Sequence, residues 1–400
     1  MAVTLKRMVI VLLALALMAP ATALAAKVPG VSDKEVVIGF STPLSGPAAL
    51  WGVTALGAKA WADYINSKGG IHGRKIRCII KDDGYNPART LANLQQMKSD
   101  IFAVLALLGS APNAAAKDFF PDNNIPLILP YANSRIFANQ PKAKQKWYFL
   151  AYPDYDDENH YLTGYAIKNL KAKKIAQFYQ NDDYGHLAWA GIEKAVKESG
   201  GKAKVVGKVP YEVTERNLST HALKLKETGA DTLIITANPL ATANIVKEMA
   251  KVGYKPTLVT NFTVADPIMH KLCGPNWVGT YITMAGIMSM PGFDKEANQV
   301  VDILMKQNPK FKGKEYLAVF GAVSMMHLAK GLELAGKNLT REGLIKAMEQ
   351  IKNWKPMGMG APTTYTPNQH HGNNSVRMTR AQKDGQNHPI GDFVVFAPRF

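Results

Sequence analysis

The segment Ala103–Asn113, AVLALLGSAPN, ends an apolar run at a glycine and a hydroxyl and then begins a helix. The six apolar residues 103–108 are typical of a strand covered on both faces of a sheet. A helix is predicted from Ser110 to about residue 120. We therefore expect the carboxyl end of a buried strand to place Gly109 and Ser110 at the start of a helix.

The same alternation of short apolar runs and amphipathic segments continues on both sides of this segment. In the first part of the chain, strands are predicted at 36–40, 77–81, 103–108 and 126–129, with helices at 48–67, 87–98 and 110–120. The pattern restarts with strands at 174–179, 204–211, 232–235 and 257–259. Strands that alternate with helices favour an α/β fold of two doubly wound lobes with parallel central sheets. Helices at 294–307, 316–335 and 340–350 follow without strands between them.

A chain of 400 residues exceeds what one core usually organises, which also favours two lobes with a cleft between them. In open parallel sheets, ligands bind beyond the carboxyl ends of the strands. This rule selects the loops 41–51, 109–113, 131–135, 180–185 and 261–266, together with Asn238.

The first 26 residues have the features of a signal peptide. Lys6 and Arg7 precede the apolar stretch Met8–Met18, and Ala23-Leu24-Ala25 has the form of a signal-peptidase site. A membrane anchor is the alternative, but the apolar stretch is shorter than the roughly 20 residues that span a bilayer. We expect an exported protein, and no later segment is expected to span.

Net charge is +17, with the lysines scattered rather than interleaved with aromatic residues. This pattern favours a solvated basic surface over a nucleic-acid or membrane interface. The only two cysteines, Cys78 and Cys273, lie in an expected strand and a distant loop. Export would permit a disulfide, but we expect two separate thiols.

Sequence signatures of common enzymes and metal sites are absent. The chain has no G-x-S-x-G, G-x-x-x-x-G-K-[ST], G-x-G-x-x-G, C-x-x-C or H-E-x-x-H motif. The adjacent His370 and His371 would point to opposite faces of an extended segment, so we interpret them as ordinary loop residues. The acidic run Asp154–His160 could bind a cation, but is more typical of the first turn of a helix.

Five segments, in chain order, resemble the leucine/isoleucine/valine class of type I periplasmic binding proteins. They are IGFSTPLSGPAALWG (38–52), GGIHGRKI (69–76), KDDGYNP (81–87), YQNDDYG (179–185) and TPNQHHGN (366–373). The resemblance implies two lobes that close on a ligand and are joined by three crossings near residues 150, 285 and 355. The first lobe would comprise 27–150 plus 285–355, and the second 151–284 plus 356–400.

The resemblance also assigns roles within the predicted cleft. Ser110 is where the family holds its ligand's carboxylate, and the start of a helix suits an anion. A simple N-cap role for Ser110 is the alternative. Asn133 replaces a threonine that bonds the same carboxylate. The expected ligand-binding residues are Trp51, Ser110, Ala111, Tyr131, Asn133, Tyr184, Asn238 and Phe262.

Phe262 departs from the family pattern, because relatives that bind amino acids have an acid there to pair with the ligand's ammonium. A buried ammonium without a carboxylate would be costly. Either Asp183 or Asp266 replaces that acid, or the ligand has no ammonium. The expected aromatic lining fits an apolar or aromatic acid.

The expected function is that of a binding receptor and not an enzyme. It would capture a small carboxylate, either a branched-chain amino acid or an aromatic or aliphatic acid, and deliver it to an ABC permease with its ATPase in the inner membrane. We expect a periplasmic monomer with no cofactor, no metal and no nucleic-acid partner. A sensor that signals to a membrane receptor would use the same cleft and is the alternative.

Overall fold

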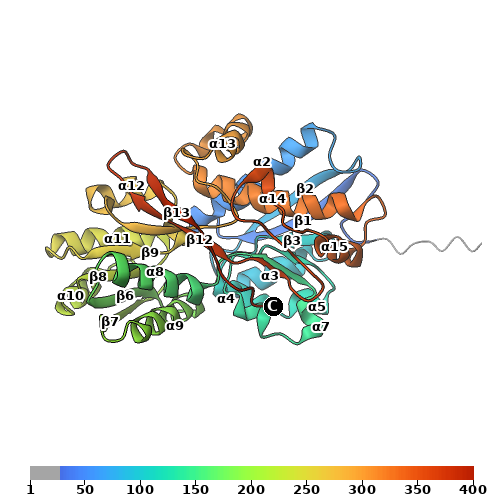
Figure 1. Ribbon diagram of the computed structural model, residues 1–400. Helices are drawn as coiled ribbons and strands as arrows, with labels where there is room; N and C mark the ends of the chain where they lie inside the picture. Colours follow the sequence, from blue (N-terminus) through green and yellow to red (C-terminus); the bar gives the residue numbers. More distant parts are fainter. Residues whose placement is uncertain (1–27) are drawn as a thin grey trace, which may run out of the picture.

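The computed structural model describes residues 28–400 as two lobes, each built on a sheet with helices against it (Figure 1). The expected signal peptide lies outside these residues. The first lobe has a six-stranded parallel sheet with the order β11-β5-β4-β3-β1-β2. Its strands are β1 (Glu35–Thr42), β2 (Lys75–Asp82), β3 (Ala103–Leu105), β4 (Leu127–Ile128), β5 (Tyr148–Ala151) and β11 (His371–Asn373).

The second lobe has a seven-stranded sheet with the order β13-β12-β10-β9-β8-β6-β7. Its strands are β6 (Lys174–Gln180), β7 (Lys204–Tyr211), β8 (Thr232–Thr236), β9 (Thr257–Thr260), β10 (Tyr281–Ala285), β12 (Ser375–Ala381) and β13 (Asn387–Val395). The predicted α/β class with parallel central sheets is confirmed. An antiparallel edge that was not predicted is added by β12 and β13, which flank a turn containing Asp384 and Gly385, a pair typical of hairpins.

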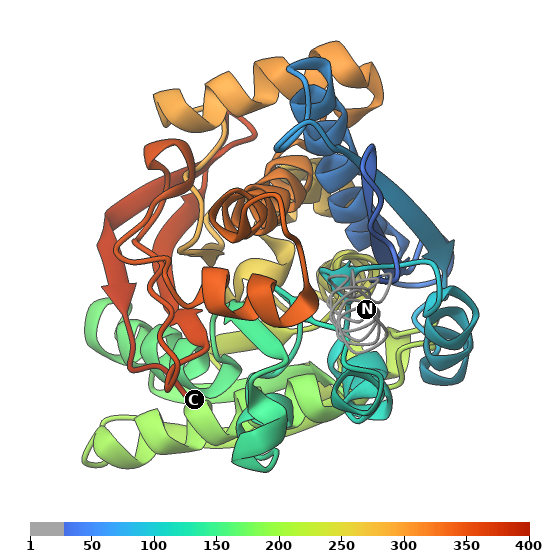
Figure 2. The same cartoon turned by 90° about the vertical axis from the view of Figure 1, so that its right-hand side faces the viewer.

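Helices cover the sheets in the order that the sequence pattern predicts, although several short ones were not foreseen. The first lobe carries η1 (Ala49–Gly52), α2 (Val53–Ser67), α3 (Pro87–Met97), α4 (Ser110–Ala116), α5 (Phe119–Asp122), α6 (Arg135–Ala138), α7 (Lys142–Gln145), α13 (Lys295–Gln307), α14 (Glu315–Ala335) and α15 (Arg341–Met348). The second carries α8 (Tyr155–Asn169), α9 (Asp183–Glu198), α10 (Ser219–Glu227), α11 (Pro239–Lys251), η2 (Phe262–Val264) and α12 (Ile268–Cys273). Figure 2 shows α14 in the interior of its lobe, with α13 outside it.

Length and composition alone would allow α14 to cross a membrane, contrary to the expectation from the sequence. Of its most apolar stretch, 83% is buried within the protein. It packs tightly against α2, where Gly321 lies against the carbonyl of Thr54. Its hydrophobicity is therefore that of a core helix.

The chain crosses between the lobes three times. It leaves the first lobe after β5, returns after β10, and leaves again between β11 and β12 at Asn374. The third crossing was predicted near residue 355. It lies later in the chain, because β11 pairs in parallel with β5 of the first lobe. Tyr365 also packs its ring against Phe149 of β5, with 5.2 Å between the centroids. Residues 356–373 thus belong to the first lobe.

The buried strand that opened the sequence analysis is shorter than predicted. Regular pairing of β3 ends at Leu105, because Ala106 has a φ of 54°. The chain then resumes beside the loop after β4, with a single parallel bridge between Leu108 and Tyr131. This bridge places Ser110 next to Asn133.

The two cysteines are free, as predicted. Cys78 lies on β2 of the first lobe, and Cys273 ends α12 in the second. Burial raises the pKa of each thiol to about 12, so neither is a reactive thiolate at neutral pH.

Candidate functional site

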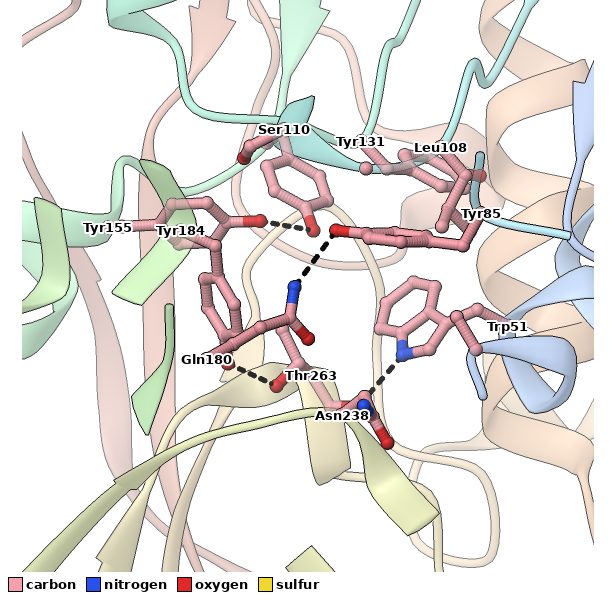
Figure 3. A pocket seen from close by; sticks show the side chains of 13 residues that line it. Trp51, Tyr85, Leu108, Ser110, Tyr131, Tyr155, Gln180, Tyr184, Asn238 and Thr263 are labelled. Carbon is pink, nitrogen blue, oxygen red and sulfur yellow. Dashed lines mark hydrogen bonds between the residues drawn. The ribbon is translucent and has the colours of Figure 1, made fainter. Parts of the chain in front are cut away.

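A cavity lies between the two lobes, at the carboxyl ends of their parallel strands (Figure 3). Its volume is about 40 Å³, which is small beside the roughly 300–1,000 Å³ of typical small-molecule sites, so this arrangement of the lobes leaves little open space between the lining side chains. No Asp, Glu, Lys or Arg is among the described residues that line it. The lining residues are Ala48, Trp51, Tyr85, Leu108, Gly109, Ser110, Tyr131, Tyr152, Tyr155, Gln180, Tyr184, Asn238 and Thr263.

Ser110 presents a hydroxyl donor to the cavity. It is the first residue of α4, whose N-cap is Gly109, and its side chain does not cap the helix. Its Oγ accepts the backbone N–H of Asn133 at 3.1 Å, and its own proton has no acceptor among the described residues. Ser110 is therefore not the N-cap of α4, contrary to the alternative interpretation. Its O–H proton remains available to a ligand.

Tyr152 and Tyr155 supply a second donor. Their hydroxyls hydrogen-bond to each other at 3.1 Å, which uses one of the two O–H protons. Burial holds the pKa of both phenols well above 10, so both keep their protons. Since no other acceptor within residues 28–400 is bonded to this pair, one proton is available to the cavity.

The amides of the opposite wall are largely occupied by partners within the protein. Gln180 Nε2 donates to Asp182 at 2.6 Å and to the Tyr85 hydroxyl at 3.2 Å, and its Oε1 accepts the Tyr211 hydroxyl at 3.0 Å. Asn238 caps α11 with its Oδ1 and donates through Nδ2 to Tyr211. Within the described chain, the unused polar groups of the cavity are therefore mainly hydroxyl donors.

Two hydrogen bonds tie η2 of the second lobe to the walls of the cavity. The indole N–H of Trp51 donates to the Thr263 carbonyl at 3.1 Å, from one lobe to the other. The Tyr184 hydroxyl shares a 2.8 Å hydrogen bond with Thr263 Oγ1 and donates to Asn261 at 2.9 Å. These bonds fix the two large rings of the wall.

Five of the eight residues expected in the site line this cavity, namely Trp51, Ser110, Tyr131, Tyr184 and Asn238. Ala111 is not among the lining residues. Asn133 also lies outside the lining, because its Oδ1 accepts the backbone N–H of Arg135. Its backbone N–H still contributes by positioning Ser110.

Phe262 belongs to the wall behind the cavity and not to its lining. Its ring is fully buried and packs edge-on against Tyr152, with 4.8 Å between the centroids. Asp183 is exposed, and Asp266 accepts the backbone N–H groups of Ile268 and Leu317. Neither acid lines the cavity, so neither replaces the acid that is missing at Phe262.

Glu158 is a buried acid behind this wall. It accepts the Phe262 N–H at 3.0 Å and also bonds the Thr283 hydroxyl. Burial is the main reason that its pKa rises to about 8, so it is largely uncharged at neutral pH.

Sequence reasoning missed several lining residues, among them Tyr85, Tyr152, Tyr155, Gln180 and Thr263. Gln180 and Thr263 lie in loops that the strand-end rule selects, and Tyr85 lies in the KDDGYNP segment. Gly109 explains how Tyr85 reaches the cavity, because a Cβ there would come within 2.4 Å of the Tyr85 ring. Tyr152 and Tyr155 flank the first crossing, which the resemblance places near residue 150, but nothing in the sequence marked these two side chains as lining residues.

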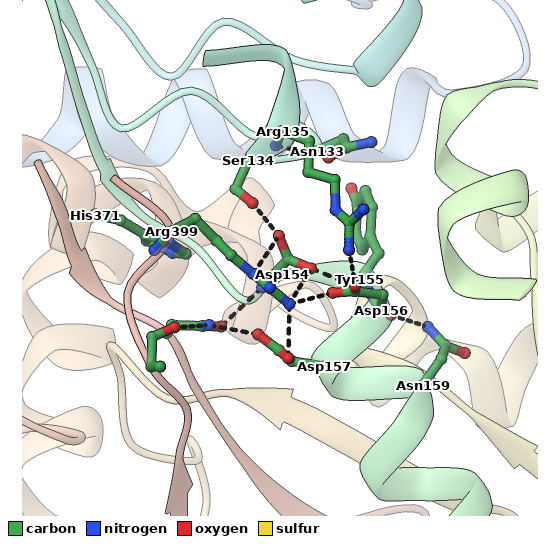
Figure 4. Close-up of polar contacts among 12 residues, drawn as sticks. Asn133, Ser134, Arg135, Asp154, Tyr155, Asp156, Asp157, Asn159, His371 and Arg399 are labelled. Carbon is green, nitrogen blue, oxygen red and sulfur yellow. Dashed lines mark hydrogen bonds and ion pairs between the residues drawn. The ribbon is translucent and has the colours of Figure 1, made fainter. Parts of the chain in front are cut away.

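The acidic run after this crossing begins α8, as predicted, with Asp154 as N-cap (Figure 4). The carboxylates of Asp154, Asp156 and Asp157 are bound by Arg399, and Asp156 also pairs with Arg135. Two guanidinium groups therefore neutralise most of the charge that would attract a cation.

His370 and His371 are buried, contrary to the interpretation as ordinary loop residues. His370 bonds Glu349 and the carbonyl of Tyr148, and His371 bonds the carbonyl of Tyr152. Burial lowers the pKa of His371 to about 4, so it is neutral at physiological pH. Both have a structural role beside β5.

Comparisons with known proteins agree with this architecture. The chain is 26% identical over 253 residues to the Leu/Ile/Val-binding protein of Escherichia coli K12, covering 62% of this chain and 67% of that protein. It is 23% identical to the Leu/Ile/Val-binding protein homolog 3 of Brucella melitensis, covering 80% and 84%.

Solved structures with the same fold include a branched-chain amino acid ABC transporter protein of Thermus thermophilus with bound valine (TM-score 0.81, 17% identity, covering 92% and 98% of the two chains). Another is a fatty acid ABC transporter substrate-binding protein of Thermomonospora curvata (TM-score 0.80, 22% identity, 92% and 94%). The named relatives are binding proteins and not enzymes. A family model described as "Periplasmic binding protein" matches residues 35–386, and the chain therefore belongs to the periplasmic binding protein family.

Proposed function

We propose that this receptor binds a small apolar carboxylic acid without an ammonium group and delivers it to an ABC permease. The observation that carries the proposal is the polarity of the inter-lobe cavity. Its unused polar groups are hydroxyl donors from Ser110 and the Tyr152–Tyr155 pair, and none of its described lining side chains is an acid.

Hydroxyl donors with no partner in the protein favour a ligand that presents acceptors. A carboxylate is an acceptor-only group with two oxygens, and its hydrogen bonds to neutral donors are charge-assisted. An ammonium would find no carboxylate among these lining residues, although aromatic faces could offset part of its desolvation. The rings of Trp51, Tyr131 and Tyr184 would enclose the apolar remainder of the ligand.

The family supplies the setting for this binding. Binding proteins of this kind act outside the cytoplasm, which agrees with the signal peptide expected in the first 26 residues, and we propose a periplasmic monomer that docks on its permease. The fatty acid transporter protein among the fold neighbours indicates that this fold can hold an apolar acid.

The test compares amino acids with their deaminated partners in calorimetry: leucine with 4-methylpentanoate, and phenylalanine with 3-phenylpropanoate. We expect at least one deaminated acid to bind, and its amino acid to bind at least tenfold more weakly. At a hundredfold its Kd, a ligand adds about 2.7 kcal/mol to stability. That should raise Tm by roughly 2–4 °C or somewhat less, which provides an independent readout.

Three other results would contradict the proposal. Preference for the amino acids would mean that the ammonium is bound despite the missing acid. Failure of every acid to bind, alongside binding of a neutral or cationic solute, would exclude a carboxylate site. Turnover of the acid during incubation would point to an enzyme.

A further inference from the structure

The loop after β4 connects a cavity hydroxyl to the second lobe through three consecutive residues. The backbone N–H of Asn133 donates to Ser110 Oγ at 3.1 Å. The Ser134 hydroxyl donates to Asp154, and the Arg135 guanidinium pairs with Asp156. Asp154 and Asp156 lie at the start of α8 in the second lobe. Asn133, which bonds the cavity hydroxyl of Ser110, is therefore only two positions before Arg135, which forms an ion pair with that lobe.

The C-terminal tail reaches the same acidic residues from the opposite side. Arg399 contacts Asp157 at 2.6 Å and Asp154 at 3.3 Å. Its backbone N–H donates to His371 Nδ1 at 3.2 Å, which leaves Nε2–H of His371 to donate to the Tyr152 carbonyl at 2.8 Å. Tyr152 carries one of the cavity hydroxyls. The tail is therefore connected through His371 to a residue that presents a donor to the ligand.

Asn374 links the third crossing to the first. Its Oδ1 accepts the backbone N–H of Asp154 at 2.9 Å, and its Nδ2 donates to Asp157 and to the carbonyl of Ala397, each at 2.8 Å. Two of the three connections between the lobes are therefore joined to each other and to the tail at the acidic start of α8 (Figure 4).

We propose that Arg135 and Arg399 are positioning residues for ligand binding, acting as an inter-lobe latch through Asp154, Asp156 and Asp157. The latch holds the lobes in the arrangement in which Ser110 and Tyr152 face the same cavity. Its physical basis is charge. One carboxylate oxygen from each of the three residues lies within 4.8 Å of the other two, and Asp154 is fully buried, so these acids repel one another unless both cations are present. This inference rests on the proposed function only for its ligand.

The test uses Arg135→Gln and Arg399→Gln in the full chain. Arg77→Gln is the matched control, because Arg77 forms a 3.2 Å ion pair with Glu35 on the neighbouring strand of its own lobe and makes no ion pair with the other lobe. The measurements are Kd for whichever acid the unmodified protein binds, and the radius of gyration with and without that acid by small-angle scattering. We expect both latch variants to bind about three- to tenfold more weakly and to be more expanded, because a smaller competent fraction lowers apparent affinity. The control should match the unmodified protein in both measurements.

A double-mutant cycle separates a latch from a general loss of structure. Arg135→Gln should have little further effect on Kd in an Asp156→Asn background, and Arg135→Lys should restore part of the affinity. Unchanged Kd and unchanged radius of gyration in both latch variants would overturn the latch, as would equal losses in the Arg77→Gln control. If the unmodified protein binds no carboxylate, the proposed function fails, but the scattering comparison still tests the latch.

Discussion

Trp51 and Thr263 join the two lobes by a hydrogen bond of 3.1 Å from the indole N–H to a backbone carbonyl, although they are 212 positions apart in sequence. Trp51 belongs to η1 of the first lobe and Thr263 to η2 of the second. The bond forms only when the lobes are in contact, so it stabilises the closed arrangement. A ligand shifts such an equilibrium only by the contacts that it makes better in one state.

Replacement of Trp51 by phenylalanine removes this bond but keeps an aromatic ring in the wall. We expect Kd for the bound acid to rise about three- to tenfold, since a neutral hydrogen bond contributes roughly 0.5–1.5 kcal/mol. Calorimetry measures the effect. Trp189→Phe is the matched control, because Trp189 on α9 packs against the core of the second lobe and Lys208 and does not line the cavity. Equal Kd values for the two variants would show that the cross-lobe bond is irrelevant to binding.

Ser110→Ala tests the hydroxyl donor at the start of α4. We expect binding to weaken by about 1–3 kcal/mol, the range for a charged acceptor that loses its partner. Calorimetry of this variant is compared with Ser67→Ala, whose hydroxyl bonds the Tyr64 carbonyl at the surface of α2. Retained affinity in a folded Ser110→Ala protein would remove Ser110 from the ligand site.

Glu158 makes stability depend on pH. Burial raises its pKa from 4.5 to about 8 in the folded protein, so the folded state holds a proton that the unfolded chain releases. The stabilisation from that proton is fully present below about pH 4.5 and is lost as pH rises towards 8. We expect the contribution of Glu158 to Tm to fall between pH 5.5 and 8.5.

Glu158→Gln supplies the control for this pH dependence, because its amide does not titrate in this range. The fall in Tm across the same interval should be smaller in the variant than in the unmodified protein. Parallel Tm curves for the two proteins would contradict the assignment.

Substitution by alanine of two helix glycines, Gly321 and Gly164, should have opposite effects on stability. A Cβ at Gly321 would meet the Thr54 carbonyl of α2 at 1.8 Å, whereas a Cβ at Gly164 on α8 would meet nothing within 4 Å. We expect Gly321→Ala to lower stability by about 1–3 kcal/mol through overpacking. Gly164→Ala should raise it by about 1 kcal/mol through helix propensity. Urea unfolding measures both, and the opposite order would contradict the close crossing of α2 and α14.

Much of the site followed from sequence because loops at the carboxyl ends of parallel strands meet at one edge. That rule predicts that the loops of Ser110, Gln180, Tyr184, Asn238 and Thr263 come together. It could not specify which side chains face inward. Asn133 and Phe262 lie in the selected loops, yet one bonds its own backbone and the other packs behind the wall.

The sequence by itself determined the local elements of this protein, because periodicity, glycines and helix-starting residues act over a few positions. It thereby fixed the two α/β lobes and the buried strand that leads to Ser110. Only the tertiary structure decided the course of the third crossing and the inward direction of Tyr85, Tyr152 and Tyr155. It also brought Arg399 to the acidic start of α8. Such contacts join residues as far as 245 positions apart, and their geometry depends on how whole lobes pack, which no short stretch of sequence encodes.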